Sequence, residues 1–393
     1  MKRITEIELK NVQDALNNQF STSLNSIYNN KLEKKFTELF NVPYAIGHVN
    51  GTATLHTALA ACGIVAGDEV IVPPLTMSST ALSVLQNGSI PIFADVDIHT
   101  FTLNPESVRS VITKKTKAIM TVALYGLPPD YDELIKICSE FHLFLIEDNA
   151  QCFLSEYKGN FAGRFGHFAS FSFQASKHLT CGEGGMLITH DENLANKARR
   201  FSSLGYAGVS ATQGKITRND IQDPNYNRHI SLGFNYRLSE VNAAVVLGQL
   251  ERADELVEQR IKVAQIFDQA LVGSTLLTRQ AEPVGYKNTY WSYSAILNTD
   301  TPKTDWYRFR DLFQKNGGDG FYAAWKLSYN EPLFSNLVQK WEGVWQKYDN
   351  QLCPISEFLQ SRMVQLKTNY WDLSEAKKQS EILKKTIKQF EQK

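Results

Sequence analysis

The sequence lacks any apolar run that could cross a membrane, because no stretch of its 393 residues approaches the ~20 apolar side chains required. Its first residues, MKRITEIELKNVQDAL, alternate charged and apolar side chains and lack the apolar core of a secretory signal. It also lacks net charge, with 41 Lys and Arg against 41 Asp and Glu, so nothing indicates nucleic-acid binding. We therefore expect a cytoplasmic protein with neither a membrane nor a nucleic-acid partner.

Cysteine is scarce and irregularly spaced. The five cysteines are an odd number, lie far apart and form no CxxC pair, which argues against a disulfide framework and against zinc-ligand spacing. Their simplest interpretation is as small buried hydrophobic side chains, and we expect no metal site. Cys152 and Cys181 lie near the motifs described below, so either could line a site without taking part in its chemistry.

Between residues 50 and 200, short apolar strands alternate with helical patterns. The expected strands are 69–72, 92–94, 117–124 and 143–146, and the expected helices are 52–62, 80–86, 105–111 and 131–141. This alternation is typical of an α/β fold with a mostly parallel sheet that helices cover on both faces. Ligands of such sheets bind beyond the carboxyl ends of the strands. Asp148 lies at the carboxyl end of the expected strand 143–146.

Helical patterns flank this region on both sides. Residues 1–45 predict two helices around a polar break at 21–23, and one long helix is expected from Ser239 to about residue 270. Aromatic residues and isolated strands follow, in WSYSAIL and DGFYAAW, before a closing helix at 374–392. We place a domain boundary near residue 250. It separates a large domain, 1–250, with an N-terminal helical segment, from a small C-terminal domain, 251–393.

Two features suggest an anionic cofactor with a basic ring. Gly51 precedes a helix in Asn50-Gly51-Thr52-Ala53, where free backbone N–H groups and the helix dipole favour an anion such as phosphate, although small residues often simply cap a helix. Asp148 ends a buried strand, where a carboxylate needs a partner. A protonated heterocyclic nitrogen or backbone N–H groups would supply one.

A third feature is Lys177, in the segment FSFQASKH. A lysine among apolar and small residues is a Schiff-base candidate, because desolvation lowers the pKa of its amine. A lone lysine is usually solvated, but the aromatic residues before it and the GEGG run at 182–185 favour the reactive interpretation. A fourth feature, GFNYRLSE at 233–240, precedes the long helix, with Ser239 as its N-cap.

Taken in order, the motifs NGTA, P-x-T, EDxAQ, YKGxxxGxxG, SFxxxK, GEGG and GFNYR resemble the sugar aminotransferases of the DegT/DnrJ/EryC1/StrS family. The resemblance is strong over residues 45–250 and continues weakly to CPISE at 353–357. It implies a fold-type-I transferase, with a mainly parallel seven-stranded sheet sandwiched by helices and a smaller C-terminal α/β domain. It also implies pyridoxal 5'-phosphate (PLP) as cofactor, with pyridoxamine 5'-phosphate (PMP) as its aminated form.

The resemblance assigns roles around the cofactor ring. Lys177 would carry the cofactor as a Schiff base, and Asp148 would pair with the pyridine nitrogen. Gln151 would contact the ring hydroxyl. Met77 stands where the family usually has an aromatic residue that stacks on the ring, and its polarisable thioether can pack there instead.

The resemblance also assigns the phosphate contacts. Thr52, Ala53 and Ser172 match the positions that bind phosphate in the family. Asn235 matches an asparagine that reaches the phosphate in the neighbouring subunit. This implies self-association as a homodimer with shared active sites.

The implied activity is ping-pong transfer of an amino group from glutamate or glutamine to a keto sugar, with a nucleotide-linked sugar as the favoured acceptor. A small phosphorylated ketone or a keto sugar acid is the alternative, because the loop at 317–329 departs from the family's HYxxxxH run. PLP- or PMP-dependent sugar dehydratases of this fold carry histidine at the lysine position, but the register from Ser172 places Lys177 there, not His178. A non-catalytic protein would not need to retain Lys177, Asp148 and Gln151 together.

Two further segments have open interpretations. Five aromatic residues could stack on a sugar or pack the small-domain core: Tyr286, Tyr290, Trp291, Tyr322 and Trp325. The polar excursion at 205–229 predicts a flap or a dimer arm, whose basic residues would meet a phosphorylated substrate or remain solvated.

Overall fold

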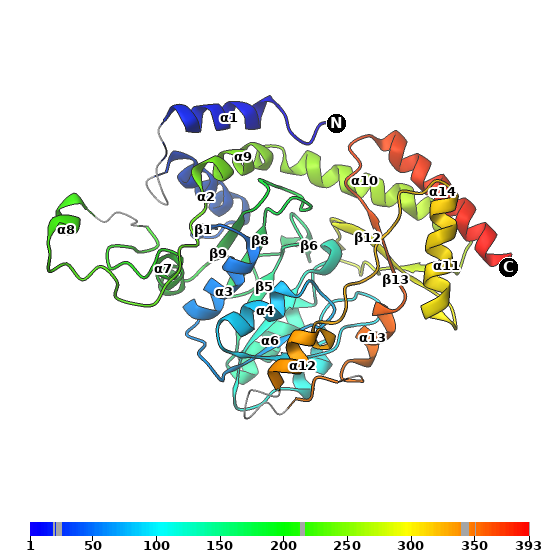
Figure 1. Cartoon of the computed structure of the whole chain (residues 1–393), viewed down its shortest axis with the longest axis horizontal. Helices are drawn as coiled ribbons and strands as arrows, with labels where there is room; N and C mark the ends of the chain where they lie inside the picture. Colours follow the sequence, from blue (N-terminus) through cyan, green and yellow to red (C-terminus); the bar gives the residue numbers. More distant parts are fainter. Residues whose placement is uncertain (19, 21–25, 213–216, 339–345, 350, 393) are drawn as a thin grey trace.

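A seven-stranded sheet forms the centre of the molecule, in the order β1-β9-β8-β5-β4-β2-β3 (Figure 1). The computed structural model describes residues 1–393 except 19, 21–25, 213–216, 339–345, 350 and 393. The strands of this sheet are β1 (Tyr44–His48), β2 (Glu69–Val72), β3 (Ile90–Phe93), β4 (Thr116–Val122), β5 (Phe144–Asp148), β8 (Phe168–Ser172) and β9 (Gly185–Thr189). Strands β3, β2, β4, β5 and β8 are parallel, whereas β9 runs antiparallel to both β8 and β1. The mainly parallel sheet confirms the predicted fold class.

Helices cover both faces of this sheet. One face packs against α3 (Gly51–Ala61), α4 (Ser79–Gln86) and α7 (Glu192–Phe201), and the other packs against α2 (Ile27–Phe40), α5 (Pro105–Ser110), α6 (Tyr131–Phe141) and α9 (Glu240–Leu250). In β2, Val70 and Val72 point into the first core while Ile71 points into the second. Successive strand side chains alternate between faces, so an unbroken apolar strand fits a sheet buried on both sides.

The predicted helix starts are confirmed by their caps. Asn50, Asn104 and Ser239 each accept a hydrogen bond from a backbone N–H in the first turn of the following helix. At the N-terminus, α1 (Glu6–Asn17) and α2 form the two expected helices, and the polar break at 21–23 lies outside the described residues.

The single long helix expected from Ser239 to about residue 270 was wrong. The chain forms α9 and then α10 (Ala253–Leu271), separated at Glu251 and Arg252. Arg252 has φ −121° and ψ 20°, and its guanidinium bonds to the carbonyl of Lys2 and to Glu8. No proline or glycine lies at the break, and the contacts of Arg252 there are with the distant N-terminal segment.

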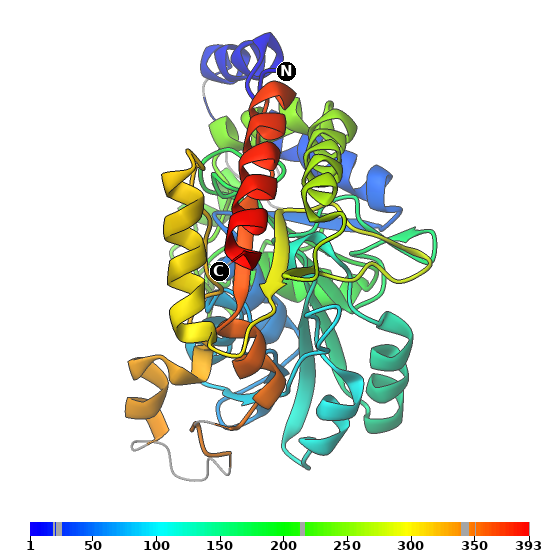
Figure 2. The same cartoon turned by 90° about the vertical axis from the view of Figure 1, so that its right-hand side faces the viewer.

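A second, antiparallel sheet lies in the C-terminal part. It contains β10 (Leu277–Arg279), β12 (Ser292–Leu297) and β13 (Met363–Lys367). Helices α10, α11 (Pro302–Lys315) and α14 (Leu373–Glu391) share a core with it and lie side by side in Figure 2. The expected strand in DGFYAAW was wrong, because only Tyr322 forms a bridge, to Gln365, and its neighbours continue no strand pairing.

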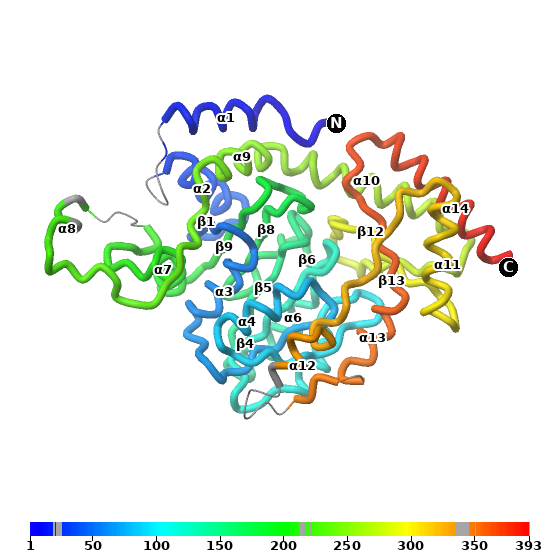
Figure 3. The backbone as a smooth tube through the Cα atoms, in the orientation of Figure 1, coloured from blue at the N-terminus to red at the C-terminus, as the bar shows by residue number. Residues whose placement is uncertain are grey.

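Part of the C-terminal half returns to the first sheet. Leu327, Tyr329, Phe334 and Leu359 belong to the same apolar core as Phe93 of β3. This returning stretch contains a 3-10 turn, η3 (Ser328–Asn330), and the helices α12 (Pro332–Val338) and α13 (Pro354–Gln360), which lie at the lower side of the molecule in Figure 3. The domain boundary near residue 250 therefore stays a prediction.

The remaining elements lie at the edges. A small sheet joins β11 (Tyr286–Lys287), β6 (Glu156–Tyr157) and β7 (Asn160–Phe161), and η2 (Leu124–Gly126) follows β4. The excursion at 205–229 carries the short α8 (Arg218–Gln222), which projects from the body in Figure 1, and its role stays a prediction. Among the described residues, no helix combines the length and apolarity that a membrane crossing needs.

Candidate active site

Lys177 lies in the loop between β8 and β9, at the carboxyl end of β8. Its N–H bonds to the Gln174 carbonyl at 2.9 Å, and the Gln174 side chain accepts from the Ser176 N–H at 2.8 Å, which closes a tight turn. Its Nζ lies 4.7 Å from the centroid of the Trp291 ring. The turn directs the lysine side chain into a cavity of about 470 Å³.

That cavity brings together most of the predicted site residues. Lys177, Asp148, Gln151, Thr52, Ser172 and Met77 all line it. They come from five separate parts of the chain: the lysine loop, the ends of β5 and β8, the start of α3 and the loop after β2. Only the parallel arrangement of the strands brings these segments to one edge of the sheet.

The amine of Lys177 is shifted toward its neutral form. Its pKa is lowered to about 8, mainly by burial and in part by the Arg260 guanidinium, while Asp148 and Glu183 oppose the shift. A neutral amine is the nucleophilic form of lysine. The environment therefore suits the Schiff-base chemistry expected of this side chain.

Asp148 is the last residue of β5 and is almost fully buried. Thr80 donates its hydroxyl hydrogen to the carboxylate at 2.8 Å, and the Ala150 N–H donates at 3.1 Å. Burial raises the pKa of Asp148, which these hydrogen bonds and Lys177 partly offset. The carboxylate forms no ion pair with any described residue, so a cationic ring nitrogen in the cavity would be its natural partner.

Gln151 and Met77 line the cavity, and hydrogen bonds hold both side chains in place. The side-chain carbonyl of Gln151 accepts the N–H of Tyr125 at 3.0 Å, which fixes the orientation of the amide. The sulfur of Met77 accepts from the N–H and hydroxyl of Ser79 at 3.1 and 2.9 Å. The thioether is thus held at the cavity edge, where a flat ring would meet it.

The start of α3 forms a close-fitting cradle beside Ser172. A Cβ at Gly51 would lie 2.9 Å from the Ser172 Cβ, and one at Gly185 would lie 2.7 Å from the Asn50 carbonyl oxygen. Thr52 donates its hydroxyl hydrogen to Ser79 at 3.1 Å. This helix start, with hydroxyl groups on both sides, fits a phosphate.

Two predicted phosphate ligands lie outside the cavity lining. Ala53 is buried, and its N–H bonds to the Asn50 side chain at 2.8 Å. Asn235 is exposed and accepts from the Arg237 side chain at 2.9 Å. Since Asn235 was expected to serve a neighbouring subunit, a single chain does not test its role, and both assignments stay predictions.

The five candidate aromatic residues divide into separate groups. Trp291 and Trp325 line the cavity with stacked rings 5.9 Å apart, and both also line an outer cavity of about 500 Å³. Tyr322 lines the outer cavity and not the inner one, while Tyr290 packs in the core of the β10-β12-β13 sheet. Tyr286 packs edge-on against the Tyr157 ring.

Sequence analysis missed Thr80 and did not separate the tryptophans from the other aromatic residues. Thr80 follows the P-x-T motif by four positions, which carries no signal for contact with a strand end 68 residues later. For the lysine register, the structure places Lys177, and not His178, at the cavity, and its role stays a prediction. His178 is buried with Nε2 3.0 Å from the Thr289 carbonyl, while Lys177 enters the cavity.

Comparison with known proteins agrees with this geometry. The model of the DegT/DnrJ/EryC1/StrS aminotransferase family matches residues 2–379. The chain belongs to this family. The GDP-perosamine synthase of Escherichia coli O157:H7 is 36% identical over 296 residues, which cover 75% of this chain and 76% of that protein.

Two further relatives support the assignment. The L-glutamine:2-deoxy-scyllo-inosose aminotransferase of Micromonospora echinospora is 36% identical over 68% of this chain and 64% of its own length. The solved aminotransferase of Psychrobacter cryohalolentis is 29% identical and superposes with a TM-score of 0.84, covering 99% of this chain and 98% of that one. This protein is accordingly a PLP-dependent aminotransferase, which confirms the predicted enzyme class and cofactor.

Proposed function

We propose that this aminotransferase moves an amino group from glutamate or glutamine to a nucleotide-linked keto sugar by a ping-pong mechanism. The observation that carries the proposal is that Lys177 and Asp148 face one cavity. Burial shifts the amine toward its neutral form, and the buried carboxylate forms no ion pair with a described residue. A reactive amine and an unpaired anion on one wall are what PLP chemistry requires.

The residues present fit the cofactor. Asp148 would hold the ring nitrogen in its protonated form, Gln151 would meet the ring hydroxyl, and Met77 would cover the ring. The phosphate would lie at the start of α3, between Thr52 and Ser172. Bound in this way, PLP supplies an electron sink for the carbon that bears the amino group.

The chain's own groups then supply positioning and proton transfer. Lys177 Nζ would take the proton from the donor carbon that carries the amino group and would give it to the cofactor carbon that keeps this group. The hydrogen bonds from Thr80 and Ala150 favour the ionised form of Asp148. In the second half of the cycle, the same two groups act in reverse on the keto acceptor.

A sugar acceptor is favoured by the two cavities. Trp291 and Trp325 present stacked rings between the Lys177 cavity and the outer one, and aromatic faces of this kind pack well on sugar rings. The outer cavity adds about 500 Å³, with Lys367 and Asn369 in its lining, which suits a larger polar group attached to the sugar. The name of the Escherichia coli relative, a GDP-perosamine synthase, agrees with a nucleotide-linked sugar.

A small phosphorylated ketone or keto sugar acid is the second candidate. It would fill the inner cavity of about 470 Å³ and leave the outer one to solvent. The two candidates differ in one measurable way, because only the nucleotide-linked acceptor depends on the outer cavity.

The test follows the two half-reactions separately. The enzyme is first converted to its PMP form with glutamate or glutamine, and keto compounds are then screened for return of the visible PLP absorbance. A nucleotide-linked keto sugar should restore the absorbance at lower concentration than the free keto sugar or a triose phosphate ketone. Lys177→Ala is the control, since it should remain folded and show no such absorbance. Equal responses to the free and the nucleotide-linked sugar would contradict the nucleotide part of the proposal.

We also propose that the enzyme acts as a homodimer. Asn235 is exposed and lies outside the lining of its own cavity. Ile230 and Leu232 nearby are exposed apolar side chains, at 53% and 78% exposure, which a second copy would cover.

A further inference from the structure

The main chain at Lys177 is held from outside the cavity by two arginines. Arg260 Nη2 donates to the Ser176 carbonyl at 2.9 Å and to the Lys177 carbonyl at 3.1 Å. Arg3 Nη2 donates to the same Lys177 carbonyl at 2.9 Å. Trp291 Nε1 donates to the Ser176 carbonyl at 3.1 Å. Two consecutive carbonyl oxygens of the lysine turn thus receive four hydrogen bonds from three distant parts of the chain.

Arg260 belongs to α10 and is 1% exposed. It forms no ion pair with any described residue, and its remaining bonds go to the Trp291 carbonyl and the Thr368 hydroxyl, both at 3.0 Å. Burial and the neighbouring Arg3 lower its pKa to about 9, so the group stays cationic at neutral pH. Burying a cation without a neighbouring carboxylate costs free energy. The hydrogen bonds of the Arg260 guanidinium go to the lysine turn and to Trp291 and Thr368 beside it.

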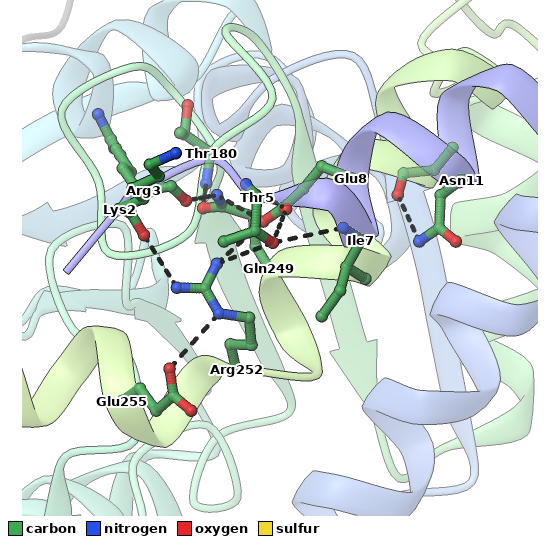
Figure 4. Close-up of polar contacts among 11 residues, drawn as sticks. Lys2, Arg3, Thr5, Ile7, Glu8, Asn11, Thr180, Gln249, Arg252 and Glu255 are labelled. Atoms are coloured by element: carbon green, nitrogen blue, oxygen red, sulfur yellow. Dashed lines mark hydrogen bonds and ion pairs between the residues drawn. The ribbon is translucent and has the colours of Figure 1, made fainter.

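Arg3 is held in place by the junction of α9 and α10. Figure 4 shows Arg252 reaching the Lys2 carbonyl, at 2.9 Å, and Gln249 Nε2 reaching the Arg3 carbonyl, at 2.8 Å. The other end of the Gln249 amide accepts the N–H of Thr180 at 3.2 Å, three residues beyond Lys177. One side chain therefore ties the N-terminal segment to the lysine loop.

We propose that Arg260, assisted by Arg3, is a positioning residue that fixes the turn carrying Lys177, so that its amine reaches the cavity in one orientation. This inference rests on the proposed role of Lys177 as the reacting amine. It predicts two separable effects, because a guanidinium supplies both hydrogen bonds and a positive charge. The bonds orient the turn, and the charge acts on the amine.

The electrostatic surroundings of the amine are defined by three charged groups. Asp148 of β5 and Glu183 of the following loop raise the pKa of Lys177, whereas Arg260 and burial lower it. Removing the Arg260 charge should therefore raise this pKa and reduce the fraction of free amine near neutral pH. A tenfold change in that fraction corresponds to about one pKa unit.

The experiment uses the PMP form of the enzyme, in which the Lys177 amine is free. Its pKa is measured as the pH dependence of acetic anhydride labelling at Lys177, followed by mass spectrometry, alongside kcat for both half-reactions. Arg260→Met should slow labelling at pH 7.5 roughly threefold to tenfold and lower kcat. Arg260→Lys keeps the charge but cannot bridge the same carbonyls, so labelling should stay near the wild-type profile while kcat still falls roughly tenfold.

Arg199→Lys is the matched control. Arg199 is also buried, and it bonds to Glu33 and to the Ala45 carbonyl on another part of the sheet. It should lower thermal stability and leave the Lys177 labelling profile and kcat unchanged. If the Arg260 variants do not fold, Arg3→Met removes one of the four bonds and should still lower kcat.

The inference is overturned if Arg260→Met or, failing that, Arg3→Met keeps the wild-type labelling profile and kcat, or if Arg199→Lys alters them equally. Failure of the proposed function has a different result. In that case Lys177→Ala would keep the visible PLP absorbance, whatever the arginine variants do.

Discussion

The hydroxyl of Thr80 donates a hydrogen bond of 2.8 Å to the carboxylate of Asp148, across 68 residues of sequence. Thr80 lies in the first turn of α4, and Asp148 ends β5. The bond lowers the pKa of a carboxylate that burial otherwise raises. It thus favours the anion that the ring nitrogen of the cofactor needs.

Replacing Thr80 tests this relationship. Thr80→Val keeps the shape of the side chain and removes the donor, which is worth about 1.5–3 kcal/mol to a charged acceptor. We expect the pKa of Asp148 to rise and the donor half-reaction to slow roughly tenfold, measured by stopped-flow loss of PLP absorbance. Thr80→Ser should restore most of the rate. A Val variant as fast as the wild type would show that the hydroxyl does not affect the carboxylate.

The pH dependence follows from Lys177. Burial lowers the pKa of its amine from 10.5 to about 8, so the neutral form grows as pH rises through this value. At pH 7 about one tenth of the amine is neutral, against less than about one thousandth for an unshifted lysine. The rate at which enzyme stripped of cofactor reacts with added PLP should rise about tenfold per pH unit below pH 8 and level off above it. A rate that keeps rising to pH 10 would contradict the lowered pKa.

Replacing Trp325 should affect binding of the acceptor and not of the amino donor. This residue is 36% exposed and lines both cavities, whereas the donor needs only the inner one. Trp325→Ala should raise KM for the nucleotide-linked acceptor threefold to tenfold, as expected for about 0.5–1.5 kcal/mol of ring stacking. The KM for glutamate or glutamine should change little, and Trp325→Phe should be milder. Equal changes in KM for both substrates would show that Trp325 maintains the shape of the cavity and does not bind the acceptor selectively.

Shared active sites are tested by mixing two inactive variants. Lys177→Ala removes the amine from a subunit's own site, and Asn235→Asp is expected to repel the phosphate in its partner's site. Subunits that exchange at random give half mixed dimers, each with one intact site, so about a quarter of the wild-type activity should return. If Asn235 served its own subunit, mixing would restore nothing. Analytical ultracentrifugation of the same samples checks that dimers form.

The sequence predicted several elements with their bounds. The bounds of β2 and α6 match the expected ranges, because unbroken apolar runs and N-cap residues are read within a few positions. The break between α9 and α10 could not be predicted, since it depends on Arg252 contacting Lys2 and Glu8. The proposed positioning role of Arg260 could not be predicted either, because it depends on hydrogen bonds to the distant turn that carries Lys177.

The sequence by itself determined the chemical groups of the site: a lysine in an apolar segment, a carboxylate after a buried strand and small residues before a helix. These are local properties, set by residue type and spacing along the chain. The tertiary structure decided how the groups combine, because Lys177, Asp148, Thr80 and Trp291 share no sequence neighbourhood. It set the pKa of Lys177 through burial and Arg260, and it separated Trp291 and Trp325 from the tyrosines that pack elsewhere. Burial and distance between remote residues exist only once the sheet has formed, so no local pattern encodes them.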